Sequence, residues 1–148
     1  MIFRSITISE AGEVAVRWET ENGSKVTVSK AFPRPDSVLA TAMQGVIPQV
    51  AEWRHEPKSE TRMFLRGISV TEKTVRVKGQ GFKDVTIIRL NVAENCDGSD
   101  RAAVVRFPAM TEEIELPGQT VMWPDMRHAV SELVAAAEQY CEAVRGAM

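Results

Sequence analysis

The densest set of side chains able to bind an anion lies between residues 62 and 92. This stretch carries seven Lys or Arg residues and only two acidic residues, in a chain whose formal net charge is −2. The seven cations are Arg62, Arg66, Lys73, Arg76, Lys78, Lys83 and Arg89. Arginine binds phosphate oxygens through two parallel N–H donors, more strongly than an isolated charge does. The composition of this stretch predicts a cationic patch suited to a phosphate-bearing ligand.

A glycine turn lies inside this cationic stretch. Backbone N–H groups around Gly79-Gln80-Gly81 can form an anion-binding concavity, and lysines flank the turn on both sides. Three arginines are expected to project toward it from neighbouring strands. The predicted ligand-binding residues are Arg62, Arg66, Arg76, Lys78, Gly79, Gly81 and Lys83. The alternative is that these cations form the solvated face of a sheet, neutralised by the acidic residues that dominate 93–148 of the same chain or by a neighbouring subunit.

Aromatic side chains offer a possible stacking surface for a nucleotide base. The rings are large and apolar, and bases stack on their faces. The candidates are Phe64, Phe82, Trp18, Trp53 and Trp123.

No residue pattern indicates catalysis. Nucleophilic catalysis needs a nucleophile, a base and a group that orients the base. The two histidines, His55 and His128, lie in neither a nucleophile-elbow nor a metal motif. Residues 78–83 lack the Gly-Lys-Ser/Thr ending of a phosphate loop and precede a strand. Cys96 and Cys141 have no metal-ligand spacing and are expected to be free thiols. A non-catalytic protein without a cofactor or metal is the expectation.

The composition excludes two broad classes of function. A pI near 5.8 gives no domain-wide basic excess of the kind that coats nucleic acid. No apolar run approaches the roughly 20 residues that a membrane-spanning helix needs, and the N-terminus lacks a signal-peptide pattern. We expect one domain over 1–148, located in the cytoplasm.

The first thirty residues predict a three-stranded meander. Residues 2–9, 14–19 and 25–31 alternate between apolar and polar, and Asn22-Gly23 is a strong hairpin signal. In the first strand the apolar face is expected to be formed by Ile2, Ile6 and Ile8.

Two segments carry apolar stripes at helical spacing, near 36–53 and 124–145. Asp36 is a suitable N-cap for the first helix, and Pro48 should kink or divide it. Gly146 is the expected C-cap of the second. The same stripes would also permit a dimer interface between helices.

The middle of the chain predicts further strands. They are expected at 62–70, 75–78, 85–92 and 102–107, with a tight turn at Glu72-Lys73 and a short edge strand at 111–116. Gly67 is expected to mark a bulge or a close backbone approach. In 62–70, Phe64, Ile68 and Val70 are expected on one face and Met63 and Leu65 on the other.

The order βββ-α-ββββ-α, with about seven strands, predicts an α+β fold in which two amphipathic helices pack on an antiparallel sheet. The residues expected in its core are Ile6, Val16, Val28, Leu39, Val46, Ile88, Val130 and Leu133.

The central segment also resembles known proteins. RGISVTEKTVRVKG at 66–79, followed by DVTIIRLNVAENCDGSDRAAVVRFPAM at 84–110, is similar to small uncharacterised proteins of tailed phages and prophages. The likeness covers most of the chain and departs from it most at 111–123. That family has no assigned activity, so no functional residue is carried over. The resemblance implies a phage setting and a role as a recombination accessory or counter-defence protein.

Two functional hypotheses follow. The first is a homo-oligomeric, non-catalytic binder that sequesters a small anionic ligand such as a nucleotide immune signal. The second is an interaction protein that binds a phage or host protein partner, or a recombination complex. Self-association is expected because the helical stripes, the cationic middle and the acidic end can complement a second copy.

Overall fold

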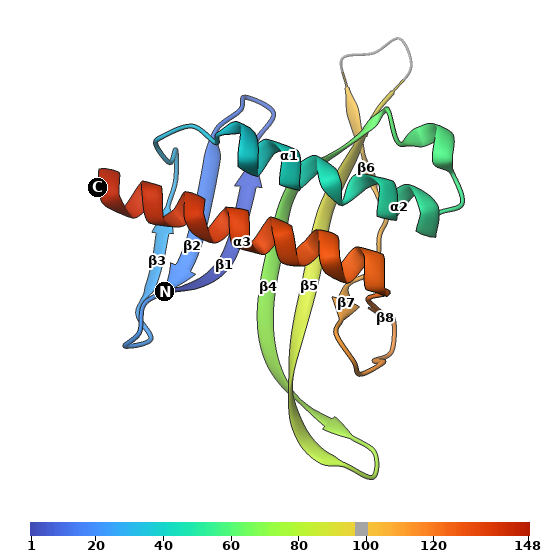
Figure 1. The fold of residues 1–148 in the computed structure, drawn as a ribbon. Coiled ribbons are helices and arrows are strands. Elements are labelled where there is room, and N and C mark those ends of the chain that lie inside the picture. Colours follow the sequence, from blue (N-terminus) through green and yellow to red (C-terminus); the bar gives the residue numbers. More distant parts are fainter. Residues whose placement is uncertain (97–100) are drawn as a thin grey trace.

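A computed structural model describes residues 1–96 and 101–148 as one mostly antiparallel sheet with helices packed on one face (Figure 1). The strands are β1 (Ile2–Ile8), β2 (Val14–Glu19), β3 (Lys25–Val28), β4 (Met63–Val77), β5 (Gly81–Asn95), β6 (Ala102–Val105), β7 (Met110–Thr111) and β8 (Thr120–Val121). The helices are α1 (Ser37–Gly45), α2 (Ile47–Trp53), the 3₁₀ turn η1 (Pro57–Ser59) and α3 (Pro124–Ala147). The predicted α+β class, with two helices on an antiparallel sheet, is confirmed.

The sheet joins two parts of the chain that are far apart in sequence. Its strand order is β3-β2-β1-β4-β5-β7-β8, with β6 also paired to β5. All pairs are antiparallel except β7 with β8. The junction is the pairing of β1 with β4, where Ser5 lies opposite Ser69 and Thr7 opposite Gly67. The N-terminal meander and the long central hairpin therefore share one continuous surface.

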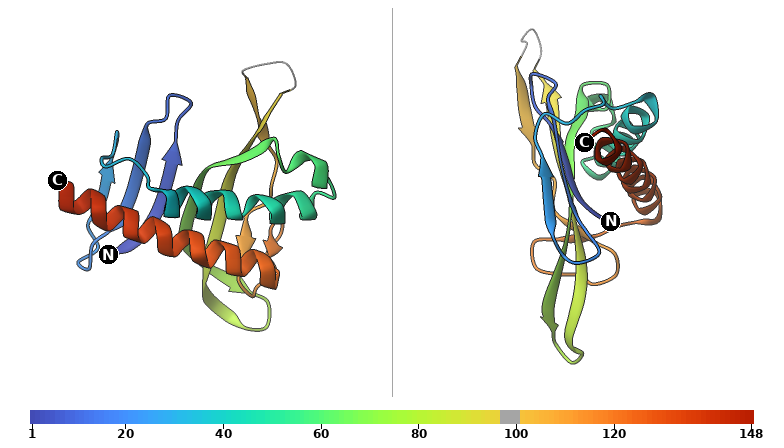
Figure 2. Two further views of the ribbon diagram at one scale, coloured as in Figure 1. Left: turned by 45° about the horizontal axis from the view of Figure 1, so that its top comes forward. Right: turned by 90° about the vertical axis from the view of Figure 1, so that its left-hand side faces the viewer.

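The core lies between the sheet and the helices. In the side view of Figure 2 all helices lie on one side of the sheet. Seven of the eight predicted core residues are buried, and Val28 is half-buried on the short strand β3. Each large aliphatic side chain buried in this way contributes about 1.5–3 kcal/mol relative to exposure, so the contact between the two helical stripes and the sheet is a large stabilising term.

Local signals for the helices are largely confirmed. The Asp36 carboxylate accepts a hydrogen bond from the Leu39 N–H at 2.9 Å, which satisfies one of the free donors at the start of α1. The helix divides at Val46, and Pro48 lies in the first turn of α2, where its missing N–H is tolerated. The predicted cap at Gly146 is wrong, because α3 continues through it to Ala147.

Two β-bulges change which side chains face the core. A register shift between Phe3 and Ser5 turns Phe3 inward at 3% exposure and leaves Ile2 outside at 47%, so the predicted inward position of Ile2 is wrong. A second shift between Leu65 and Gly67 puts Leu65 on the same face as Ile68, although the predicted alternation separated them. The extra residue in a bulge resets the two-residue alternation, which local pattern reading cannot follow.

The central hairpin is longer than predicted. No turn occurs at Glu72-Lys73, because β4 continues to Val77 and pairs with β5 down to Val77 opposite Gly81. Thr74 Oγ1 donates to the Asp84 carboxylate across the strands at 2.7 Å within this pairing. None of residues 72–84 is buried, and Figure 1 shows this segment projecting beyond the rest of the sheet. We call residues 72–84 the arm.

The predicted edge strand at 111–116 is also wrong. Only Met110–Thr111 extends along β5, and the chain returns as β8 to run parallel to β7. Thr111 Oγ1 bonds to the Ile114 carbonyl, a local turn contact that ends the strand early.

Candidate anion-binding site

The structure divides the predicted ligand-binding residues into two groups. Arg62 and Arg66 lie at the start of β4, whereas Arg76, Lys78, Gly79, Gly81 and Lys83 lie at the tip of the arm. Ten residues of extended strand separate Arg66 from Arg76, a distance of about 33 Å. The expectation that these side chains converge on one turn is therefore wrong, because β4 continues straight through the predicted turn.

The two arginines at the start of β4 already have partners. Arg62 Nη2 lies 3.3 Å from the Glu94 carboxylate, and Arg66 Nη1 lies 3.5 Å from that of Glu10. The Arg66 guanidinium also lies over the Phe64 ring, 5.3 Å from its centroid. These contacts give both residues structural roles within the sheet.

The predicted glycine turn forms at the tip of the arm, but the turn does not lie in an enclosed pocket. Gly79 and Gly81 have φ values of 80° and 74°, which favour glycine. Arg76 lies opposite Phe82 and Lys83 opposite Val75, so alternation places the two cations on opposite faces of the ribbon. This geometry offers single charges to an anion and no enclosure around it.

The predicted stacking surface does not form. Trp18 is buried in the core, Trp53 packs edge-on against Phe107 at 5.1 Å between centroids, and Trp123 Nε1 donates to Gln49 Oε1 at 2.8 Å. Phe82, at the far end of the arm, is the one strongly exposed ring of the five. The prediction of a shared aromatic surface is wrong.

A different polar surface is formed by the sheet face opposite the helices, which we call the open face (Figure 2). Pairing registers align one row of side chains across five strands: Thr27, Arg17, Ser5, Ser69 and Arg89. Their sequence neighbours, including Ile6, Ile68 and Ile88, face the core, so this row faces away from it. Arg17 and Arg89 are about 14 Å apart across three strand spacings, with two hydroxyls between them.

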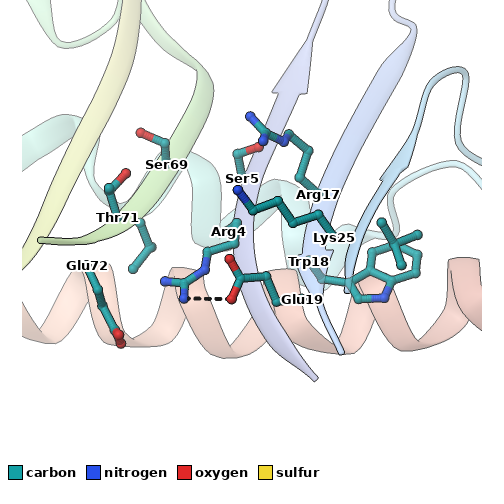
Figure 3. A pocket seen from close by; sticks show the side chains of 11 residues that line it. Arg4, Ser5, Arg17, Trp18, Glu19, Lys25, Ser69, Thr71 and Glu72 are labelled. Carbon is teal, nitrogen blue, oxygen red and sulfur yellow. Dashed lines mark hydrogen bonds and ion pairs between the residues drawn. The ribbon is translucent and has the colours of Figure 1, made fainter. Parts of the chain in front are cut away.

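A pocket of about 290 Å³ opens on this face around β1, β2 and the middle of β4. Figure 3 shows cationic and hydroxyl side chains gathered there from four strands. Its polar lining consists of the cations Arg4, Arg17 and Lys25, the hydroxyls Ser5, Ser69 and Thr71, and the carboxylates Glu19 and Glu72. The lining has one more positive than negative charge, and its hydroxyls can donate to an anion.

Arg4 is the unusual residue of this pocket. It lies in the bulge of β1, and its side chain is only 19% exposed. Nη2 donates to the Glu19 carboxylate at 3.1 Å (dashed in Figure 3). Nε and Nη1 are buried and have no hydrogen-bond partner among the described residues. An unsatisfied buried donor costs about 1–3 kcal/mol, and more when the group is charged. This guanidinium therefore has unused capacity for an anionic acceptor.

The sequence carried part of the signal for this site. Alternation in 14–19 and 25–28 already places Arg17 and Lys25 on the polar face of the meander. The bulge that holds Arg4 and the pairing of β1 with β4, which brings Ser69 beside Ser5, depend on contacts between distant residues. The local density of charged residues along the sequence favours the arm, because it contains no information on which strands are neighbours in the sheet.

The remaining reactive groups do not gather into a second site. Burial, together with Glu138 and Glu142, raises the pKa of the Cys141 thiol to about 12, so it stays protonated at neutral pH. Cys96 is exposed, and neither cysteine forms a disulfide. His128 pairs with Glu132 on the surface of α3 at 3.1 Å. The described part of the chain holds no group of three side chains suited to a metal ion.

Comparison with known proteins gives no relative. No family model, no curated protein and no solved structure matches the chain. In residues 1–96 and 101–148, no helix has both the length and the apolar character needed to cross a bilayer.

Proposed function

We propose that the chain binds a small phosphate-bearing anion, such as a nucleotide, in the pocket on the open face. The observation that carries this proposal is the buried guanidinium of Arg4, two of whose nitrogens have no partner among the described residues. Arg17 and Lys25 supply further positive charge at the rim, and Ser5 and Ser69 supply hydroxyl donors.

The dimensions and electrostatics of the pocket suit the phosphate part of such a ligand. A volume of about 290 Å³ is at the lower end of the range for small-molecule sites, enough for one or two phosphate groups with the remainder lying along the open face. Because Nε and Nη1 are covered, binding includes a turn of the Arg4 side chain away from Glu19. A phosphate then replaces that carboxylate as a two-point acceptor.

The chain would act by holding its ligand. No histidine or cysteine lines the pocket, and among the described residues no hydrogen bond joins its hydroxyls, from Ser5, Ser69 and Thr71, to the lining carboxylates that could act as a base. Sequestration of a host nucleotide signal is the role proposed for such a protein in a phage setting. Recovery of the ligand unchanged after prolonged incubation supports this role, whereas a hydrolysed product contradicts it.

Calorimetric titration of two matched arginine variants tests where the ligand binds. Pyrophosphate, ADP and a cyclic dinucleotide serve as probes. Arg17→Ala is expected to weaken binding ten- to a hundredfold, since a hydrogen bond to a charged group contributes about 1.5–3 kcal/mol. Arg76→Ala, which changes another exposed arginine, in the arm, is expected to leave the affinity unchanged. The opposite pattern would place the ligand at the arm, and no binding of any probe would end the proposal.

A further inference from the structure

The arm lacks the support that a two-stranded ribbon ordinarily needs. Residues 72–84 include no buried side chain, and the ribbon projects away from the rest of the sheet (Figure 1). Isolated two-stranded hairpins are marginally stable in water, and Phe82 is 74% exposed at the end of this one. Aromatic side chains, Phe included, are enriched at protein interfaces, which makes Phe82 a candidate anchor for a partner.

The charge of the arm restricts the chemistry of that partner. Between residues 76 and 83 the ribbon carries Arg76, Lys78 and Lys83 and no acidic residue. Phe82 lies directly opposite Arg76 in the pairing register, so the ring has this cation beside it on the same face of the ribbon, while Lys83 lies on the other face. The complementary surface would be an apolar groove with acidic walls.

The same chain presents such a groove between α1 and α3. Its volume is about 810 Å³, and its lining includes small or apolar residues such as Ala42, Gly45 and Ala129. Val38 is 58% exposed at one side. Asp125 and Glu132 supply two negative charges, Glu132 in a pair with His128 of the same lining, and the lining contains no Lys or Arg. Figure 2 shows the two helices side by side on the face of the sheet opposite the open face.

We propose that the arm of one copy docks into the α1–α3 groove of a second copy, reciprocally, to form a two-fold dimer. Phe82 packs among the small residues of the partner's groove, and the cations of the arm approach Asp125 and Glu132. Two-fold symmetry makes both contacts identical and leaves no arm or groove unused. The dimer contacts lie away from the pocket on the open face, so the dimer is independent of the proposed anion site.

A charge exchange between arm and groove tests this dimer. The arm variant is Lys78→Glu with Lys83→Glu, and the groove variant is Asp125→Lys with Glu132→Lys. Each variant by itself places like charges together in both contacts. Its dimer dissociation constant, measured by light scattering and sedimentation, is expected to rise at least tenfold. Mixing the two restores complementarity in both contacts, since the acidic arm meets the basic groove and the basic arm meets the acidic groove. The mixture is expected to form a 1:1 heterodimer.

The controls separate this outcome from misfolding and from other partners. Lys58→Glu changes an exposed lysine outside the arm and should dimerise like the wild type. Circular dichroism melts should show each variant folded. A monomeric wild type at 200 μM, or a mixture of the two variants that stays monomeric, would overturn the proposal. So would an assembly that keeps growing with concentration, or a monomer that binds a DNA duplex through Lys78 and Lys83.

Discussion

Replacing Arg4 with methionine, together with Glu19→Gln, is expected to lower the affinity for the phosphate ligand more than about a hundredfold while the protein stays folded. The guanidinium supplies two or more charge-assisted contacts, each contributing about 1.5–3 kcal/mol. Stability is expected to change by less than about 1 kcal/mol, since the Arg4–Glu19 pair is only partly buried and neutral groups of similar shape often replace even a buried pair at no cost. Titration calorimetry and urea denaturation measure the two effects separately.

Two single variants make this prediction sharper. Glu19→Gln alone removes the carboxylate that holds Arg4 Nη2, so it is expected to bind the ligand as tightly as the wild type or more tightly. Arg4→Lys keeps the charge but loses the forked donors, and an intermediate loss is expected. If the double variant binds normally, or if Glu19→Gln weakens binding as much as Arg4→Lys does, Arg4 has a structural role only.

Gly67→Ala is expected to destabilise the protein by about 2–4 kcal/mol. A Cβ at this position would lie 2.5 Å from the Ile6 carbonyl oxygen and 3.2 Å from the Thr7 Cα. Both are backbone atoms of β1, so the steric clash can be removed only if β1 moves away from β4 at the junction of the sheet. Because the Ser5–Ser69 pair lies two positions along from the Thr7–Gly67 pair, in the same short junction, the same variant should also weaken ligand binding.

Gly45→Ala is the matched control for this substitution. A Cβ at Gly45 meets nothing within 4 Å, and the residue ends α1 with a helical backbone. Alanine there is expected to be neutral or to stabilise by up to about 1 kcal/mol. Urea denaturation of both variants compares them directly. Equal stability of Gly67→Ala and wild type would show that β1 and β4 separate at little cost.

Sequence reasoning succeeded where the signal was local. Asp36, Pro48 and Gly67 each act through their own backbone or side chain, and each was located correctly. It failed where the outcome depended on pairing. Ile2 and Phe3 exchange places because a bulge resets the alternation, and Glu72-Lys73 stays extended because β5 pairs along its whole length.

The candidate site shows the same division. Charge density predicts one cluster for the cations of 62–92. The 15-residue strand β4 instead places the cations at its two ends far apart. Arg4, Arg17 and Ser69 come together only because β1 lies between β2 and β4. Periodicity determines which face a residue occupies, but not which strand lies beside it, and the site depends on both.

Backbone amide mapping by NMR tests the location of the anion site most directly. Pyrophosphate is added to the ¹⁵N-labelled protein, and the shift of each amide signal is followed through the titration. Saturating shifts are expected at Ser5, Arg17 and Ser69, with the signals of Gly79 and Gly81 unchanged. Saturating shifts at the two glycines, with the amides of β1 and β2 unmoved, would contradict a site on the open face.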